Sequence, residues 1–109
     1  MSEDKSLEAQ VLNLADLVDY QGGSVVSRAL INKSTGTVTL FAFDKDQFLT
    51  EHTTPFDALV YCFDGEVEVV ISGKPFTLKK GQTIIMPANQ AHSLRAIEKF
   101  KMALVMIKS

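Results

Sequence analysis

Two histidines carry most of the chemistry that this sequence offers. His52 and His92 are the two histidines of the chain, and they lie in separate segments. His52 precedes an apolar stretch that ends at Gly65, and His92 follows the segment from Gly81 to Pro87. Imidazole binds transition metals and transfers protons near neutral pH. If the two rings face each other, they would bind a metal ion or a polar ligand, or one would act as a general acid or base.

Two carboxylates near the first histidine are further candidates. Glu51 directly precedes His52, and Asp57 follows it by five residues. Neighbouring residues of a strand point to opposite faces, so either carboxylate would share a site with His52 only if the chain bulges. We favour a simpler role for Asp57, as a cap for the turn after Pro55.

Short strands must position these side chains. Apolar runs alternate with turn residues along the chain, a pattern typical of an all-β sandwich or barrel. The dipeptide Asp64-Gly65 is a strong hairpin signal. The predicted strands cover residues 24–31, 37–43, 58–63, 66–71, 76–78, 83–86, 91–96 and 100–107.

Two of these strands predict a partner. Residues 38–43 and 58–63 are apolar at almost every position, which indicates burial on both faces. A barrel covers only the inner face of its own strands. We therefore expect a second subunit to cover the outer face, and the sequence predicts a homodimer.

The segment before the barrel has weaker signals. Residues 1–6 are polar and are expected to be frayed. We expect a short strand at Gln10–Leu12 and then a short helix over residues 14–18, with an N-cap signal at Asn13. A single helical face is the alternative, through Leu7, Val11, Leu14 and Val18. Gly22-Gly23 ends this unit.

Composition excludes several classes of protein. The chain of 109 residues suits one domain, with the barrel over about residues 24–107. A net charge of -2 does not favour nucleic acid. No apolar run approaches the roughly 20 residues that span a bilayer. Without a visible signal peptide, and with one cysteine and so no intrachain disulfide, a cytoplasmic location is expected.

Two spaced motifs resemble those of the small single-domain cupins. The first cupin motif runs Gly, five residues, His, one residue, His, three or four residues, Glu, six residues, Gly. Here its positions hold Asp46, His52, Thr54, Ala58 and Gly65. The second motif runs Gly, five residues, Pro, one residue, Gly, two residues, His, three residues, Asn. Here its positions hold Gly81, Pro87, Asn89, His92 and Ala96.

The resemblance covers roughly residues 37–107 and implies an RmlC-like jelly-roll barrel. Matching cupins bind one divalent metal such as Ni, Zn, Mn or Fe through His, His, Glu and His. In this chain only His52 and His92 remain of that set, because Thr54 and Ala58 occupy the other two positions. A mononuclear site generally needs at least three protein ligands. The resemblance therefore implies the fold more strongly than the metal.

The predicted ligand pocket contains the two histidines with Gln47, Cys62 and Met86. Cys62 has the strand parity of Ala58 and should point inward, where a lone cysteine most often acts as a small apolar residue. Most methionines and phenylalanines are expected in the core, although a barrel of this size can hold one small molecule. We expect Lys99, Lys101 and Lys108, like Glu66 and Glu68, to face solvent.

Three functions fit these observations. The first is a small-molecule binding or sensing module without a reaction of its own. The second is a metal-dependent enzyme, of the oxygenase or isomerase type, that uses His52 and His92 with a third ligand from the protein or the substrate. The third is a purely structural or partner-binding dimer, which only the apolar outer strands favour.

Overall fold

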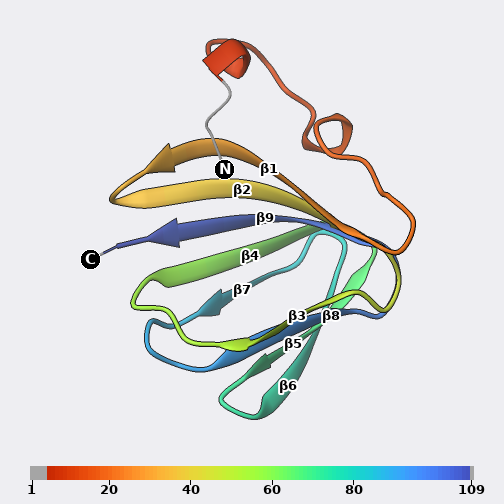
Figure 1. Ribbon diagram of the computed structural model, residues 1–109, viewed down its shortest axis with the longest axis vertical. Helices are drawn as coiled ribbons and strands as arrows, with labels where there is room; N and C mark the ends of the chain where they lie inside the picture. The colour runs from red at the N-terminus through yellow and green to blue at the C-terminus, as the bar shows by residue number, and fades with distance from the viewer. Residues whose placement is uncertain (1–4, 109) are drawn as a thin grey trace.

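The computed structural model describes residues 5–108, and it confirms the predicted all-β fold (Figure 1). Two short 3-10 helices come first, η1 (Lys5–Leu7) and η2 (Leu14–Asp16). Nine strands follow: β1 (Val25–Lys33), β2 (Gly36–Phe43), β3 (Phe48–His52), β4 (Asp57–Asp64), β5 (Glu66–Ile71), β6 (Lys74–Lys79), β7 (Thr83–Met86), β8 (His92–Ala96) and β9 (Phe100–Ile107). No helix of this described range is long and apolar enough to cross a membrane.

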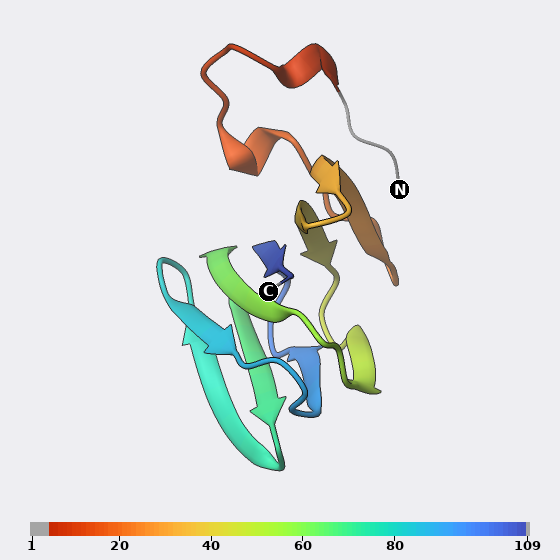
Figure 2. The same ribbon diagram turned by 90° about the vertical axis from the view of Figure 1, so that its left-hand side faces the viewer.

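The strands form two antiparallel sheets that face each other. One sheet has five strands in the order β1-β2-β9-β4-β7, and the other has four in the order β3-β8-β5-β6. Figure 2 shows the two layers edge-on, with the N-terminal segment outside the larger sheet. Connections that cross between the sheets give the jelly-roll arrangement.

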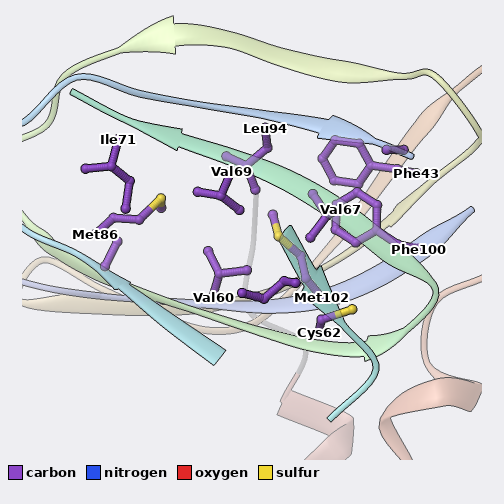
Figure 3. Packing of buried hydrophobic residues seen from close by; sticks show 13 residues of the cluster. Phe43, Val60, Cys62, Val67, Val69, Ile71, Met86, Leu94, Phe100 and Met102 are labelled. Atoms are coloured by element: carbon purple, nitrogen blue, oxygen red, sulfur yellow. The ribbon is translucent and has the colours of Figure 1, made fainter. Parts of the chain in front are cut away.

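Side chains of alternate residues fill the space between the sheets. In β5 the residues Val67, Val69 and Ile71 are buried, while Glu66 and Glu68 are only partly buried on the other face. Phe43 and Phe100 stack with ring centroids 4.4 Å apart at one end of this core. Figure 3 shows the core continuing to the opposite end of the barrel. Each fully buried aliphatic or aromatic side chain contributes about 1.5–3 kcal/mol to folding.

A second apolar cluster lies on the outer face of the five-stranded sheet. Residues 14–20, here called the N-terminal arm, pack Leu14, Leu17, Val18 and Tyr20 against Leu40, Ala42 and Ala103 of β2 and β9. The two-faced burial predicted for residues 38–43 is therefore confirmed. The chain's own arm covers this part of the face, and the homodimer stays a prediction.

Polar contacts hold the arm in place. The Tyr20 hydroxyl donates a hydrogen bond of 2.5 Å to Oδ2 of Asp64. Lys101 Nζ donates to the Ala15 carbonyl at 2.8 Å and lies 5.0 Å from the centroid of the Tyr20 ring. Burial, followed by the contact with Asp64, raises the pKa of Tyr20. The prediction that Lys101 faces solvent was wrong, because its side chain is only 8% exposed. The Ala15 carbonyl of the arm accepts a hydrogen bond from the ammonium group, which explains how this charged residue can be buried.

The N-terminal predictions were only partly right. Gln10–Leu12 is not a strand, and Val11 is 98% exposed, because neither sheet has a strand beside it. The helix after it is a single 3-10 turn, whose Asn13 makes no side-chain cap. The fraying expected for residues 1–6 falls largely on residues 1–4, which lie outside the described part of the chain.

Candidate ligand site at the histidine pair

Pairing of β3 with β8 brings the two histidines together. His92, Leu94 and Ala96 of β8 are buried on the inner face. Leu49 pairs with Leu94 and His52 pairs with His92, so β3 has one residue more than β8 between these two pairs. This bulge reverses the alternation of side chains in β3. As a result His52 points to the same face as Leu49. In a regular strand, residues three positions apart would point to opposite faces.

The two rings meet through their Nε2 atoms. These atoms lie 3.1 Å apart, and the ring planes are inclined at 70°. His52 Nδ1 lies 2.8 Å from the Thr50 carbonyl oxygen, and His92 Nδ1 lies 3.2 Å from the Gln90 carbonyl oxygen. A carbonyl oxygen only accepts hydrogen bonds, so each Nδ1 is the protonated nitrogen of its ring.

This tautomer directs both Nε2 lone pairs at one point. When both rings are neutral, neither Nε2 has a proton to share, so the pair requires a proton, a donor group or a cation between the two atoms. Burial lowers the pKa of His92, and the nearby His52 lowers it further. His92 is 3% exposed, whereas His52 is exposed. The pair therefore has one nitrogen fixed in the protein interior and one that solvent reaches.

Glycine positions of the two motifs share one backbone conformation. Gly65 and Gly81 have φ of 76° and 88°, and Asp46 and Asn89, which replace glycine, have φ of 68° and 66°. Asp and Asn are among the few residues with side chains that tolerate this left-handed region. Gly65 is required for a second reason, since a Cβ there would lie 1.8 Å from the Lys99 carbonyl oxygen. The turns that carry the motifs are thus preserved although two glycines are replaced.

The two remaining ligand positions of the motif add no metal ligand to the two histidines. Ala58 is buried in the core, and Thr54 Oγ1 accepts a hydrogen bond from the Phe56 amide. Asp57 is exposed, and its Oδ1 accepts a hydrogen bond from the Ala88 amide at 2.9 Å, a capping role as expected. Glu51 is also exposed.

The donor set therefore fits only half of a cupin metal site. Within residues 5–108, no three His, Cys, Asp or Glu side chains gather closely enough to hold a metal ion. His52 and His92 would supply two nitrogens, and any other ligand would have to come from solvent or from a bound molecule.

The other predicted pocket residues divide between the two ends of the barrel. Met86 and Ile71 lie together at one end, and Ile71 pairs with His92 (Figure 3). Cys62 lies at the opposite end, where its thiol contacts the Asp64 carbonyl oxygen. Cys62 is fully buried, as its parity predicted, and burial raises its thiol pKa.

Gln47 also lies away from the histidines. Its carbonyl accepts a hydrogen bond from Ala96, which is four residues beyond His92 in β8, or about 13 Å along a strand. The structure thus joins His52, His92 and Met86 at one end, and separates Gln47 and Cys62 from them.

Sequence reasoning did not identify Gln90, which orients His92. A surface hollow of about 490 Å³ begins beside this residue, at the open edges of β6 and β7. Three of its lining side chains are polar, namely Ser72, Lys74 and Gln90. The other five are apolar: Ile71, Phe76, Ile84, Ile85 and Pro87. Gln90 and Ile71 both adjoin His92, so this hollow and the histidine pair are neighbours.

Comparisons with known proteins agree with this architecture. The family described as Cupin domain matches residues 30–108. A conserved protein of unknown function from Streptococcus pyogenes is 36% identical, with a TM-score of 0.92 over 100% of this chain and 96% of that chain. A Cupin 2 conserved barrel domain protein from Leptotrichia buccalis is 42% identical, with a TM-score of 0.87 over 89% of this chain and 47% of that chain.

An RmlC-like cupin from Shewanella frigidimarina, 18% identical, shares the fold with a TM-score of 0.74 over 81% of this chain and 79% of that chain. No curated protein matches the chain.

Proposed function

This chain belongs to the cupin domain family, and from that premise we propose that it is a small-molecule-binding protein whose ligand is held by His52 and His92. One observation supports this most strongly. Both Nδ1 atoms face carbonyl oxygens, which leaves two Nε2 lone pairs 3.1 Å apart with no proton of their own. A structural remnant needs no such convergence, whereas a binding site gains from it.

The geometry also restricts the chemistry of the ligand. Two neutral imidazole nitrogens accept hydrogen bonds and repel anions, so the ligand should present an O–H or N–H group, or a cation, to the pair. The nearby hollow is lined largely by apolar side chains such as Phe76 and Ile84. We therefore infer a small, mostly apolar molecule with at least one hydrogen-bond donor.

Native mass spectrometry of the purified protein, followed by thermal-shift screening of small hydroxylated and amine-bearing metabolites, tests this proposal. We expect a bound species or a raised unfolding temperature in the wild type, and its loss in His52→Ala and His92→Ala. Gln47→Ala is the matched control, because Gln47 lies at the other end of the barrel. Binding that survives in both histidine variants, or no binding to any probe, would contradict the proposal.

A metal-dependent cupin enzyme is the second candidate. It is favoured by the same 3.1 Å separation, since metal–imidazole bonds of about 2.1 Å allow one ion to contact both nitrogens. A divalent Ni, Zn, Mn or Fe ion would supply Lewis-acid or oxygen chemistry there. The chain itself would hold the ion with two nitrogens and would leave the remaining positions to solvent and substrate.

Elemental analysis separates the two candidates. A stoichiometric transition metal that is lost in His52→Ala and in His92→Ala would support the enzyme. Absence of metal as purified, together with no thermal shift on adding any of the four ions, would exclude it.

We also propose a cytoplasmic setting, on the basis of one buried cysteine that has no cysteine partner.

A further inference from the structure

One row of paired residues crosses the whole four-stranded sheet. His52 of β3 pairs with His92 of β8. Ile71 of β5 pairs with His92 on one side and with Lys74 of β6 on the other. Directly paired residues of neighbouring antiparallel strands point to the same face of a sheet. Because Ile71 and His92 lie on the inner face, Lys74 belongs to that face too. The row therefore has an imidazole pair at one end, an apolar side chain in the middle and a lysine at the other end.

Lys74 ends this row at the hollow beside the histidines. The hollow of about 490 Å³ has Ile71 and Lys74 in its lining, and Lys74 is the one charged residue among the described residues that line it. Its Nζ lies 5.4 Å from the centroid of the Phe76 ring, two residues further along the same face of β6. The ammonium group is thus held over an apolar wall of the hollow, where an anionic group of a ligand would meet it.

Two strand spacings separate the lysine from the buried histidine. Neighbouring strands lie about 4.8 Å apart, so the backbone of Lys74 is roughly 10 Å from that of His92 across β5. Gln90 joins the two regions, because its carbonyl contacts His92 Nδ1 and its Oε1 accepts a hydrogen bond of 3.3 Å from Ser72 in the lining of the hollow. A molecule that reaches from one end of the row to the other therefore passes over the apolar side chain of Ile71.

We infer that the ligand is a carboxylic acid with an apolar body and a distal hydrogen-bond donor such as a hydroxyl. The inference rests on the proposed function and adds the chemical class of the ligand. The donor meets the two Nε2 lone pairs of His52 and His92, which repel an anion. The carboxylate is directed to the opposite end of the row, where Lys74 supplies a positive charge. The apolar body lies along the hollow between them.

Calorimetric titration with straight-chain acids that carry a terminal hydroxyl tests the inference. The probes run from hydroxybutanoate to hydroxydecanoate, each beside its neutral methyl ester. At the chain length that binds most tightly, we expect the wild type to prefer the acid over its ester by at least about 5-fold, because the pairing with Lys74 is charge-assisted. Lys74→Gln should abolish this preference and leave ester binding unchanged, whereas Lys74→Arg should keep the preference.

Lys79→Gln is the matched control. Lys79 is an exposed lysine of the same strand, but its odd position places it on the opposite face of β6. We expect this variant to prefer the acids as the wild type does. Equal binding of acids and esters by the wild type would overturn the inference and leave the proposed function intact. A preference that survives Lys74→Gln, or one lost equally in Lys79→Gln, would also overturn it. No binding of either series would contradict the inference and the proposed function together.

Discussion

His52 and His92 are 40 residues apart in the chain, yet their Nε2 atoms lie 3.1 Å from each other at one end of the barrel. Each ring is fixed by a carbonyl two residues before it, Thr50 for His52 and Gln90 for His92. Both rings are thus oriented by the same kind of local hydrogen bond. What distinguishes them is burial: His92 is buried, which lowers its pKa, whereas His52 is exposed.

The pH dependence of stability should report the burial of His92. Burial lowers its folded pKa below the ordinary value of 6.5, so the unfolded chain takes up a proton before the folded chain does. Its contribution is complete above pH 6.5 and is lost as the pH falls through the folded pKa. We expect the free energy of unfolding, measured in urea between about pH 5 and pH 8, to fall on the acid side. The fall should be shallower in His92→Gln, and an identical profile in that variant would contradict this assignment.

Truncating the two histidines should have unequal effects on stability. His92→Ala removes a buried ring together with its hydrogen bond to the Gln90 carbonyl and its contact with His52, which we expect to cost about 2–4 kcal/mol. His52→Ala removes an exposed ring that water replaces, so the cost should stay below about 1 kcal/mol. Urea unfolding of both variants at neutral pH measures the difference. Equal losses would mean that the pair acts as one structural unit.

Gly65 should not tolerate a side chain. It combines a φ of 76° with a Cβ position only 1.8 Å from the Lys99 carbonyl oxygen, so Gly65→Ala must displace the backbone. We expect a loss of more than about 4 kcal/mol, or no folded protein. Gly73 is the control, since its φ is 80° but nothing lies within 4 Å of its Cβ position. Gly73→Ala should cost only about 1–2 kcal/mol, and comparable losses in both would show that the contact with Lys99 is unimportant.

The N-terminal arm should loosen when its hydroxyl contact is removed. Tyr20→Phe deletes the hydrogen bond to Asp64 and keeps the ring under Lys101, so we expect a cost of about 1–2 kcal/mol. Hydrogen exchange of residues 14–20 should accelerate more than that of the core strands. Tyr61→Phe serves as the control, because it also removes one tyrosine hydroxyl, from an exposed side chain of β4. Uniform acceleration throughout the chain would instead indicate that the arm opens only on global unfolding.

Cys62 should be inert in the folded protein. Its side chain is fully buried, and burial raises its pKa, so thiolate is scarce. We expect a thiol reagent to label the folded chain at least about 100-fold more slowly than the chain in urea. Because the sequence has one cysteine, labelling reports this position alone. Rapid labelling of folded protein would show that this end of the barrel opens.

Much of the fold was predictable because alternation is clear where strands lie between core and solvent. The β5 prediction, residues 66–71, matches the strand in the structure, and β7 likewise agrees at residues 83–86. β3 was not predicted, because four of its five residues are exposed and its sequence has no apolar period. Residues 10–18 were predicted as a strand and a helix, since the surface on β2 and β9 that the arm packs against is distant in sequence.

The candidate site was predictable only as to its two histidines. Motif spacing identified both, but their contact depends on the bulge between Leu49 and His52, and alternation alone argues against it. The tautomers of the two histidines depend on contacts with backbone carbonyls. Every residue has a backbone carbonyl, so residue types do not reveal these contacts. For Cys62, parity was the available guide, and parity says which face a side chain takes but not at which end of the strand it lies.

The position of β9 has a consequence for how the protein is made. Of the nine strands in residues 5–108, β9 is the last to be synthesised, yet it stands in the middle of the larger sheet, between β2 and β4. While the ribosome is still extending the chain, β2 and β4 have no strand to join them, and the arm lacks Lys101 and Ala103. Strand pairs can form early, but the larger sheet must be completed after residues 100–107 have emerged. A nascent chain held before that point would show protease sensitivity throughout the arm.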